Sequence, residues 1–253
     1  MKDIHWIFFD LDDTLWNFSY NSHLSLKFMY ENFPIISEIF NLEERFIEEY
    51  HKNNAALWEA FSRSEVTSEQ LRVERWRSTL FPKIRDNEVI KICEELDFNY
   101  LNRLAQFPNL LEGAKEMLDD LTKSFLISII SNGFLKTQYS KIIHSGLWRY
   151  ITRLIVSEEI GQNKPHPDIY RYAVEETGAK GPLLMIGDNL YADVLGAMKS
   201  GWNAIWFNPE RKIFPYSSDN LKDMEINPKL LIGITGNIEE THKLILRFFN
   251  QQK

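Results

Sequence analysis

The stretch IHWIFFDLDDTL (Ile4–Leu15) decides the fold of this chain. Its apolar first half is followed at once by Asp10, Asp12 and Asp13, which is typical of a short buried strand that ends in an acidic turn. Carboxylates this close together raise one another's pKa unless a cation neutralises them. Mg²⁺ suits that task because it binds one or two protein carboxylates together with water and phosphate oxygens. The stretch therefore predicts a metal–phosphate site at the end of the first strand.

Length and composition bound the class of protein. The chain has 253 residues, of which 44% are hydrophobic, including 17 Phe and 7 Trp. This allows a sizeable core in one large domain or in a domain with an insertion. A formal net charge of −7 argues against a nucleic acid polymer held on a broad basic surface.

Compartment signals are few. The single cysteine, Cys93, cannot form an intrachain disulfide, which fits a reducing compartment. The N-terminus lacks the pattern of a signal peptide, and no run approaches the ~20 apolar residues of a membrane span. We therefore expect a cytoplasmic protein with no membrane partner.

Residues 16–106 show helical periodicity, whereas strands and helices alternate from residue 107 onward. Thr67 and Gln70 form a capping-box pattern that predicts the start of a helix. The later segments FLISIIS, TRLIVS, PLLMIGD and NAIWFN are typical of buried strands separated by helices. Such alternation predicts a parallel sheet covered on both faces.

The predicted fold class is therefore α/β, a Rossmann-like parallel sheet with helices on both faces, plus an inserted all-helical domain. The core would comprise residues 1–15 and 107–253, and the insertion residues 16–106. Within the core, residues 209–229 suggest an irregular loop, followed by a last strand in KLLIGIT and a last helix in ETHKLILRFF.

Ligands of open parallel sheets bind beyond the carboxyl ends of the strands. Taken singly, the polar groups at the strand ends have ordinary explanations as turns, helix caps or surface charges. Together they bring carboxylates, a hydroxyl beside a helix N-terminus and one lysine to the same edge. They are Asp10 and Asp12, Ser131-Asn132-Gly133, Lys164, and Asp188 with Asp193.

In order, these groups resemble the four motifs of the haloacid dehalogenase-like (HAD) hydrolase superfamily. The motifs are matched by Asp10-Leu11-Asp12-Asp13-Thr14, Ser131-Asn132-Gly133, Lys164-Pro165, and Gly187-Asp188-Asn189 with Asp193. The resemblance covers nearly the whole chain, and residues 16–106 are similar to the superfamily's helical (C1-type) cap. It implies a phosphoric monoester hydrolase that uses Mg²⁺.

The resemblance also implies catalytic roles. Asp10 would attack phosphorus to form an aspartyl phosphate, and Lys164 would balance its charge. Asp12 would protonate the leaving oxygen and then activate water. The halide-removing members of the superfamily lack this second aspartate, because a halide leaves without a proton. Asp12 therefore favours phosphoryl chemistry over dehalogenation.

Binding roles follow from the same resemblance. Ser131, Asn132 and Gly133 would hold the phosphoryl oxygens at a helix N-terminus. Mg²⁺ would be bound by Asp10, Asp188 and the main-chain carbonyl of Asp12. Asn189, Asp193 and Thr14 would support the metal site from outside its ligand shell.

Substrate choice is expected from the helical insertion and from the segment after the first motif. The candidates are Trp16, Trp58, Arg72, Arg75 and Trp76, whose rings could stack on a nucleobase and whose guanidinium groups could contact a sugar or base. The alternative is packing, because aromatic residues at helical spacing usually form a core. Arg72 and Arg75 would then pair with neighbours such as Glu69 and Glu74.

The insertion and the segment IGDNLYADVLGAMKSGWNAIWFNP are similar to those of the pyrimidine 5′-nucleotidase subfamily. This resemblance favours a small phosphorylated substrate such as a nucleoside monophosphate. A sugar-phosphate phosphatase or a phosphomutase of the same superfamily is the alternative. A 2-haloacid dehalogenase and a silent binding protein are less favoured.

Overall fold

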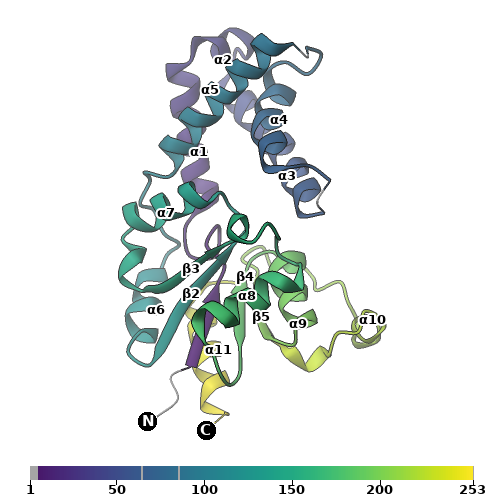
Figure 1. Ribbon diagram of the computed structural model, residues 1–253. Helices are drawn as coiled ribbons and strands as arrows, with labels where there is room; N and C mark the ends of the chain where they lie inside the picture. Colours follow the sequence, from purple (N-terminus) through teal and green to yellow (C-terminus); the bar gives the residue numbers. More distant parts are fainter. Residues whose placement is uncertain (1–4, 64, 85, 253) are drawn as a thin grey trace. The chain divides into compact units, whose positions relative to one another are not determined.

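The computed structural model describes residues 5–63, 65–84 and 86–252 (Figure 1). Ile4, the start of the stretch quoted first, lies outside the described residues. The chain divides into two compact units, one of Met1–Asn17 with Pro108–Lys253 and one of Phe18–Phe107. We call them the sheet unit and the helical unit.

The sheet unit contains one six-stranded sheet in the order β3-β2-β1-β4-β5-β6, in which every neighbouring pair is parallel. The chain moves outward from β1 to β2 and β3, then crosses back to β4 on the other side. β1 therefore lies beside the switch point of the sheet, where parallel α/β folds bind ligands. The strands are β1 (His5–Phe9), β2 (Phe125–Ser131), β3 (Ile151–Val156), β4 (Leu184–Gly187), β5 (Asn203–Phe207) and β6 (Leu231–Thr235).

Helices cover both faces of this sheet because successive strand side chains point to opposite sides. Trp6 and Phe8 pack in one cluster with residues of α8 and α9, while Ile7 and Phe9 alternate with them and are also fully buried. The predicted Rossmann-like fold is confirmed. Its main helices are α6 (Ala114–Leu121), α7 (Leu135–His144), α8 (Pro167–Thr177), α9 (Gly196–Lys199) and α11 (Ile238–Asn250).

The shorter elements of the sheet unit differ in part from expectation. The prediction of an irregular loop over residues 209–229 was wrong where α10 (Ser218–Asp223) and the 3-10 turn η4 (Pro228–Leu230) form. Ser217 and Asn220 cap α10 reciprocally, with an Asn in the place usually taken by Glu or Gln. The remaining turns are η1 (Leu147–Arg149), η2 (Ser157–Glu159) and the π-helical η3 (Leu190–Leu195) that leads into α9.

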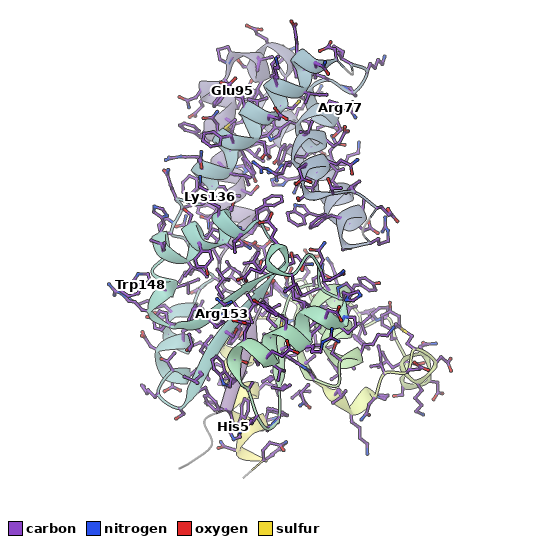
Figure 2. The ribbon with its side chains drawn as sticks, viewed as in Figure 1. His5, Arg77, Glu95, Lys136, Trp148 and Arg153 are labelled. Carbon is purple, nitrogen blue, oxygen red and sulfur yellow. The ribbon has the colours of Figure 1, made fainter. Side chains whose placement is uncertain are left out.

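The helical unit contains only helices among its described residues, and its side chains fill the space between them (Figure 2). Thr67 and Gln70 make the predicted capping box at the start of α4. Tyr50, Trp76 and Tyr100 contact one another in the core. The helices are α1 (Phe18–Asn32), α2 (Pro34–Ile39), α3 (Glu43–Ser62), α4 (Ser68–Leu80) and α5 (Asn87–Leu104).

The chain leaves and re-enters the sheet unit at adjacent points. The amide of Leu111 donates to the carbonyl of Leu15 over 2.9 Å, and that of Asn17 donates to Asn109 over 3.1 Å. The segments just before and just after the insertion therefore run antiparallel and are hydrogen-bonded to each other. No helix in the described parts of the chain is long and apolar enough to cross a bilayer.

Candidate active site

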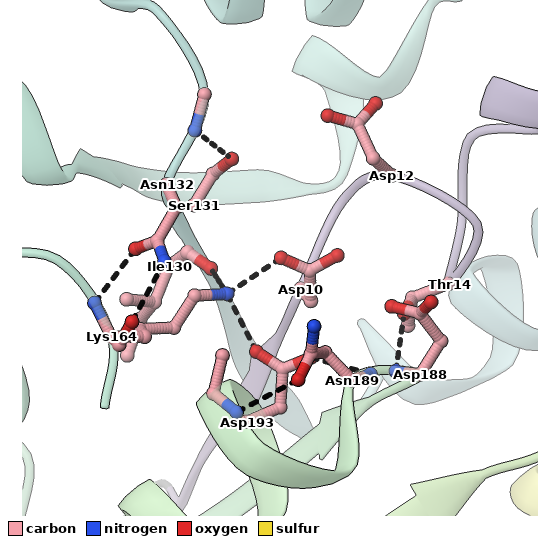
Figure 3. Close-up of polar contacts among 12 residues, drawn as sticks. Asp10, Asp12, Thr14, Ile130, Ser131, Asn132, Lys164, Asp188, Asn189 and Asp193 are labelled. Atoms are coloured by element: carbon pink, nitrogen blue, oxygen red, sulfur yellow. Dashed lines mark hydrogen bonds and ion pairs between the residues drawn. The ribbon is translucent and has the colours of Figure 1, made fainter. Parts of the chain in front are cut away.

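Lys164 lies at the centre of the polar groups that follow the strands (Figure 3). Its Nζ lies 2.6 Å from Oδ1 of Asp10 and 2.7 Å from Oδ1 of Asp193. It also donates to the carbonyl of Ile130 over 2.6 Å. The oxygens of Asp10 and Ile130 accept hydrogen bonds from the ammonium group, and Asp193 forms an ion pair with it. The side chain is 2% exposed, so its position is fixed by these contacts rather than by solvent.

Negative charge exceeds positive charge at this point. Asp10, Asp188 and Asp193 each offer a carboxylate oxygen, and these oxygens all lie within 4.8 Å of one another. Burial raises the pKa of Asp10 from 3.8 to about 7, and Asp193 adds to this effect while Lys164 opposes it. Burial and the charge of Asp10 likewise raise the pKa of Asp188 well above its usual value.

The pKa of Lys164 is raised as well, which for a lysine favours the charged form. Burial disfavours its charge, but Asp10 and Asp193 outweigh burial and hold the pKa of Lys164 above its ordinary range. Lys164 is therefore an ammonium, and one such charge does not neutralise three carboxylates. The donor set of hard oxygens with excess negative charge fits a divalent cation such as Mg²⁺.

Asp188 is held by Thr14 in the turn after β1 and by Trp206 in β5. Thr14 is 1% exposed, and its Oγ1 accepts from the amide of Asp188 over 3.1 Å. The same hydroxyl lies 3.5 Å from Oδ1 of Asp188, to which it donates. On the other side, Nε1 of Trp206 donates to the Asp188 carbonyl over 2.8 Å. Thr14 thus fixes the backbone and orients the carboxylate of Asp188.

Asp193 requires the absence of a side chain at Gly187. A Cβ at Gly187 would lie 2.3 Å from Oδ2 of Asp193, which is too close for any real contact. That oxygen accepts from the amide of Asn189 over 3.0 Å, while Oδ1 faces Lys164. Oδ1 of Asn189 caps the following turn by accepting from the amides of Tyr191 and Ala192.

The loop after β2 is tied to the loop that carries Lys164. The side chain of Asn132 donates to the carbonyl of Lys164 over 2.9 Å and accepts from its amide over 2.7 Å. Asn132 therefore uses both ends of its side-chain amide to join the two loops. Ser131 is 2% exposed, and its Oγ accepts from the amide of Gly133 over 3.1 Å.

Asp12 does not join this cluster, and its carboxylate is directed away from Asp10 (Figure 3). Its two oxygens lie 2.7 and 2.9 Å from Nζ of Lys141. Nε2 of Gln138 donates to Oδ2 of Asp12 over 2.8 Å. Sequence reasoning missed both partners on α7. The sequence did contain a signal for them, because two long polar residues three positions apart lie on one face of a helix and can share a partner.

The four motifs and the parallel sheet agree with a comparison to known families, in which residues 4–201 match the haloacid dehalogenase-like hydrolases. The chain belongs to this family. The resemblance inferred from the motifs is therefore confirmed.

Two curated relatives of this HAD-like hydrolase are phosphatases. It is 32% identical over 215 residues to pyrimidine 5′-nucleotidase YjjG of Escherichia coli, covering 83% of this chain and 88% of that protein. It is 27% identical over 205 residues to the human N-acylneuraminate-9-phosphatase, covering 80% and 82% of the two chains. These relatives are consistent with a phosphoric monoester hydrolase.

A solved structure is similar over the full length of the HAD-like hydrolase. It is the hydrolase YfnB of Bacillus subtilis, with a TM-score of 0.79 and 25% identity, covering 97% of this chain and 100% of that one. That crystal structure is bound to magnesium and reveals interdomain movement.

The side chains that were candidates for substrate choice lie in different environments. Arg75 and Trp76 are 2% and 0% exposed, so neither presents a surface to a ligand, and packing of the helical unit explains both. Arg72 and Arg75 both donate to Asp97 on α5. The partner that the sequence did not indicate is therefore Asp97, while pairing with Glu69 and Glu74 stays a prediction.

The two remaining aromatic candidates also differ. Trp16 is 0% exposed, and its ring centroid lies 4.5 Å from Nζ of Lys141. Trp16 therefore packs within the sheet unit beside the partner of Asp12. Trp58 is half-buried on α3, with its ring 5.5 Å from that of Phe61. Trp58 and Arg72 are the candidates whose side chains are in part exposed.

Proposed function

We propose that this HAD-like hydrolase is a Mg²⁺-dependent phosphomonoesterase in which Asp10 is the nucleophile. The observation that carries the proposal is the buried cluster of Asp10, Asp188 and Asp193 around the single ammonium of Lys164. Such a cluster needs a divalent cation to ionise fully, and it stands at the carboxyl end of the central strand. When bound, Mg²⁺ would neutralise the carboxylates and offset the charge of the phosphoryl oxygens.

The residues that would hold the metal are Asp10, Asp188 and the main-chain carbonyl of Asp12, with Thr14 and Asp193 positioning the cluster. Lys164 keeps one oxygen of Asp10 in place, so that the other oxygen is available for attack. Ser131 and the backbone of the following loop bind the phosphoryl oxygens ahead of α7.

The reaction then proceeds in two displacements. In the first, an oxygen of Asp10 bonds to phosphorus, the ester P–O bond breaks, and the leaving oxygen takes its electron pair together with a proton from Asp12. In the second, a water oxygen attacks phosphorus and gives a proton to Asp12, which releases phosphate and restores Asp10. Asp12 has no task in the removal of a halide, and this argues against dehalogenation.

We further propose that the preferred substrates are nucleoside monophosphates, with pyrimidine bases favoured. The support is the name and 32% identity of the nucleotidase relative. The neuraminate phosphatase relative favours sugar phosphates as the second class, at 27% identity. We infer that the helical unit, residues 18–107, acts as the cap that selects between them.

The test is a panel of phosphomonoesters assayed with Mg²⁺ and with chelator. It contains pyrimidine and purine nucleoside monophosphates, sugar phosphates and p-nitrophenyl phosphate, with 2-haloacids as the negative control. We expect phosphate release that requires Mg²⁺, highest kcat/KM on a pyrimidine nucleotide and no halide release. Equal turnover in chelator would overturn the metal-dependent mechanism, and a sugar phosphate as best substrate would overturn the nucleotide assignment.

The matched variant is Asp10→Asn. It should retain the circular dichroism spectrum of the wild type and lose phosphatase activity by at least about 10⁴-fold, because an amide cannot form the aspartyl phosphate. Full turnover by this variant would refute the role of Asp10.

A further inference from the structure

Two residues outside the four motifs bind Asp12. Lys141 and Gln138 are 3% and 0% exposed, and both lie on the inner side of α7. Lys141 contacts both carboxylate oxygens of Asp12 at 2.7 and 2.9 Å. A buried ammonium is costly unless it is paired. Lys141 is therefore held within the sheet unit by its ion pair with Asp12, beside the ring of Trp16.

Gln138 joins Asp12 to the phosphate-binding loop. Its Nε2 donates to Oδ2 of Asp12 over 2.8 Å and to Oγ of Ser131 over 2.6 Å. Only the nitrogen end of the amide can face a carboxylate favourably, which fixes its orientation. Its Oε1 is buried and has no hydrogen-bond partner among the described residues, so the nitrogen contacts determine where this side chain lies.

The same contact sets the direction of the Ser131 hydroxyl. A hydroxyl has one donor and two acceptor sites. Both acceptor sites of Ser131 are occupied, one by Nε2 of Gln138 and one by the amide of Gly133 at 3.1 Å. The remaining O–H hydrogen is therefore left to donate to an incoming phosphoryl oxygen.

The loop is shaped to admit the Gln138 amide. A Cβ at Gly133 would lie 2.3 Å from Nε2 and 2.5 Å from Cδ of Gln138. Gly133 thus leaves the space that this amide occupies.

We propose that Gln138 and Lys141 are positioning residues that hold the proton-transferring Asp12 and the phosphate-binding Ser131 as one unit. As Asp12 gives its proton to the leaving oxygen, negative charge develops on its carboxylate, and the ammonium of Lys141 and the amide of Gln138 stabilise that charge. This inference rests on the proposed function, because it assigns Asp12 the task of leaving-group protonation.

The test compares variants on two substrates that differ in their need for an acid. An alkyl phosphate such as a nucleoside monophosphate leaves as a basic alkoxide, whereas p-nitrophenyl phosphate leaves as a stable phenolate. The variants are Lys141→Met and Gln138→Leu, with Lys141→Arg as the conservative change. Lys136→Met is the control, because Lys136 is an exposed lysine on the same helix (Figure 2).

We expect Lys141→Met and Gln138→Leu to lower kcat/KM for the alkyl phosphate by about 10- to 100-fold. For Lys141→Met the loss on p-nitrophenyl phosphate should stay within about threefold, since that leaving group needs little protonation. Gln138→Leu should lower kcat/KM on both substrates, and more on the alkyl phosphate, because Gln138 also contacts the phosphate-binding Ser131. Lys141→Arg should recover most of the loss, because a guanidinium binds a carboxylate through two N–H groups. Lys136→Met should match the wild type on both substrates.

A second readout uses the Asp12→Asn background. If Lys141 acts through Asp12, adding Lys141→Met there should cost less than about twofold further on the alkyl phosphate. Lys141→Gln, which keeps a polar end, replaces Lys141→Met if that variant does not fold.

Equal losses on both substrates for Lys141→Met, or its full loss again in the Asp12→Asn background, would overturn the positioning role and leave the phosphatase assignment intact. A wild-type protein without Mg²⁺-dependent phosphatase activity would instead overturn the proposed function, and the positioning role with it.

Discussion

Thr14 shows how a residue without charge can control a charged site. Its buried hydroxyl accepts from the amide of Asp188 and donates to the carboxylate of the same residue. A carboxylate that must bind a metal gains from such support because its orientation is fixed before the ion arrives. The hydroxyl of Thr14 is therefore as much a part of the site as the acids beside it.

Thr14→Val tests this role with little change in shape. Valine keeps the volume but leaves the amide of Asp188 without its acceptor. We expect affinity for Mg²⁺ to fall about 10- to 100-fold, measured by titration calorimetry at neutral pH. Thr122→Val is the control, because its hydroxyl donates only to a carbonyl of its own helix region. Similar affinities in the two variants would contradict the role of Thr14.

Among the elements of the fold, the strands were predicted best. β2 coincides with the predicted segment FLISIIS, because a strand buried on both faces is a continuous apolar run. Helix ends with a capping pattern, such as Thr67 before α4, were equally clear. The helix α10 was missed because its cap uses Asn220 and the segment carries few apolar residues.

The site could be predicted as far as its residues follow strands. Asp10 and Asp188 directly follow strands and Ser131 ends one, so topology alone brings them to one edge. Lys164 lies further along, in the loop between η2 and α8. Asp97 as the partner of two arginines was not predictable, since it depends on how two helices pack. The spacing of Lys141 and Gln138 places both on one face of a helix, but the pairing of Lys141 with Asp12 spans 129 positions of sequence and could not be predicted.

The buried ion pair between α4 and α5 is the main polar contact of the helical unit. Arg75 and Asp97 have side chains that are 3% and 1% exposed, and Arg72 adds a second contact of 2.7 Å. Asp97→Asn would remove the negative charge that pairs with the buried guanidinium of Arg75. We expect a loss of about 3–5 kcal/mol in the free energy of unfolding of this unit, measured by urea unfolding followed by circular dichroism.

The matched control is Glu59→Gln in the same unit. Glu59 pairs with Arg63 at 2.7 Å, but both side chains are largely exposed, so solvent screens the pair. This variant should unfold at the same urea concentration as the wild type. A comparable loss in both variants would show that burial does not distinguish the two pairs.

For the molecule as a whole, the carboxylate cluster links stability to pH. Asp10 has a pKa of about 7 in the folded chain, against the ordinary value of 3.8 that applies to the unfolded chain. Between these two pH values the folded form therefore holds a proton that the unfolded form has lost. The free energy of unfolding of the metal-free protein should therefore fall as pH rises from 4 to 7. The stabilising contribution is complete below pH 3.8 and is lost as pH passes the folded value.

Mg²⁺ should reverse this trend, because it binds the ionised carboxylates in place of the proton. At about 100 times its dissociation constant the ion adds about 2.7 kcal/mol. We expect the rise in Tm on adding Mg²⁺ to be larger at pH 8 than at pH 5. Asp10→Asn should flatten the pH dependence in chelator. A wild type whose metal-free stability falls no more steeply from pH 4 to pH 7 than that of Asp10→Asn would contradict this linkage.

The hydrogen-bonded pairs Leu15–Leu111 and Asn17–Asn109 determine how easily the insertion could be exchanged. Because the two ends of the insertion already touch, a short turn could bridge them, and the cost of closing a loop grows only slowly with its length. An insertion of a different size could therefore stand between Asn17 and Asn109 without moving the strands of the sheet unit. Under the proposed function, such an exchange would change the substrate while Asp10, Asp188 and Lys164 stay in place.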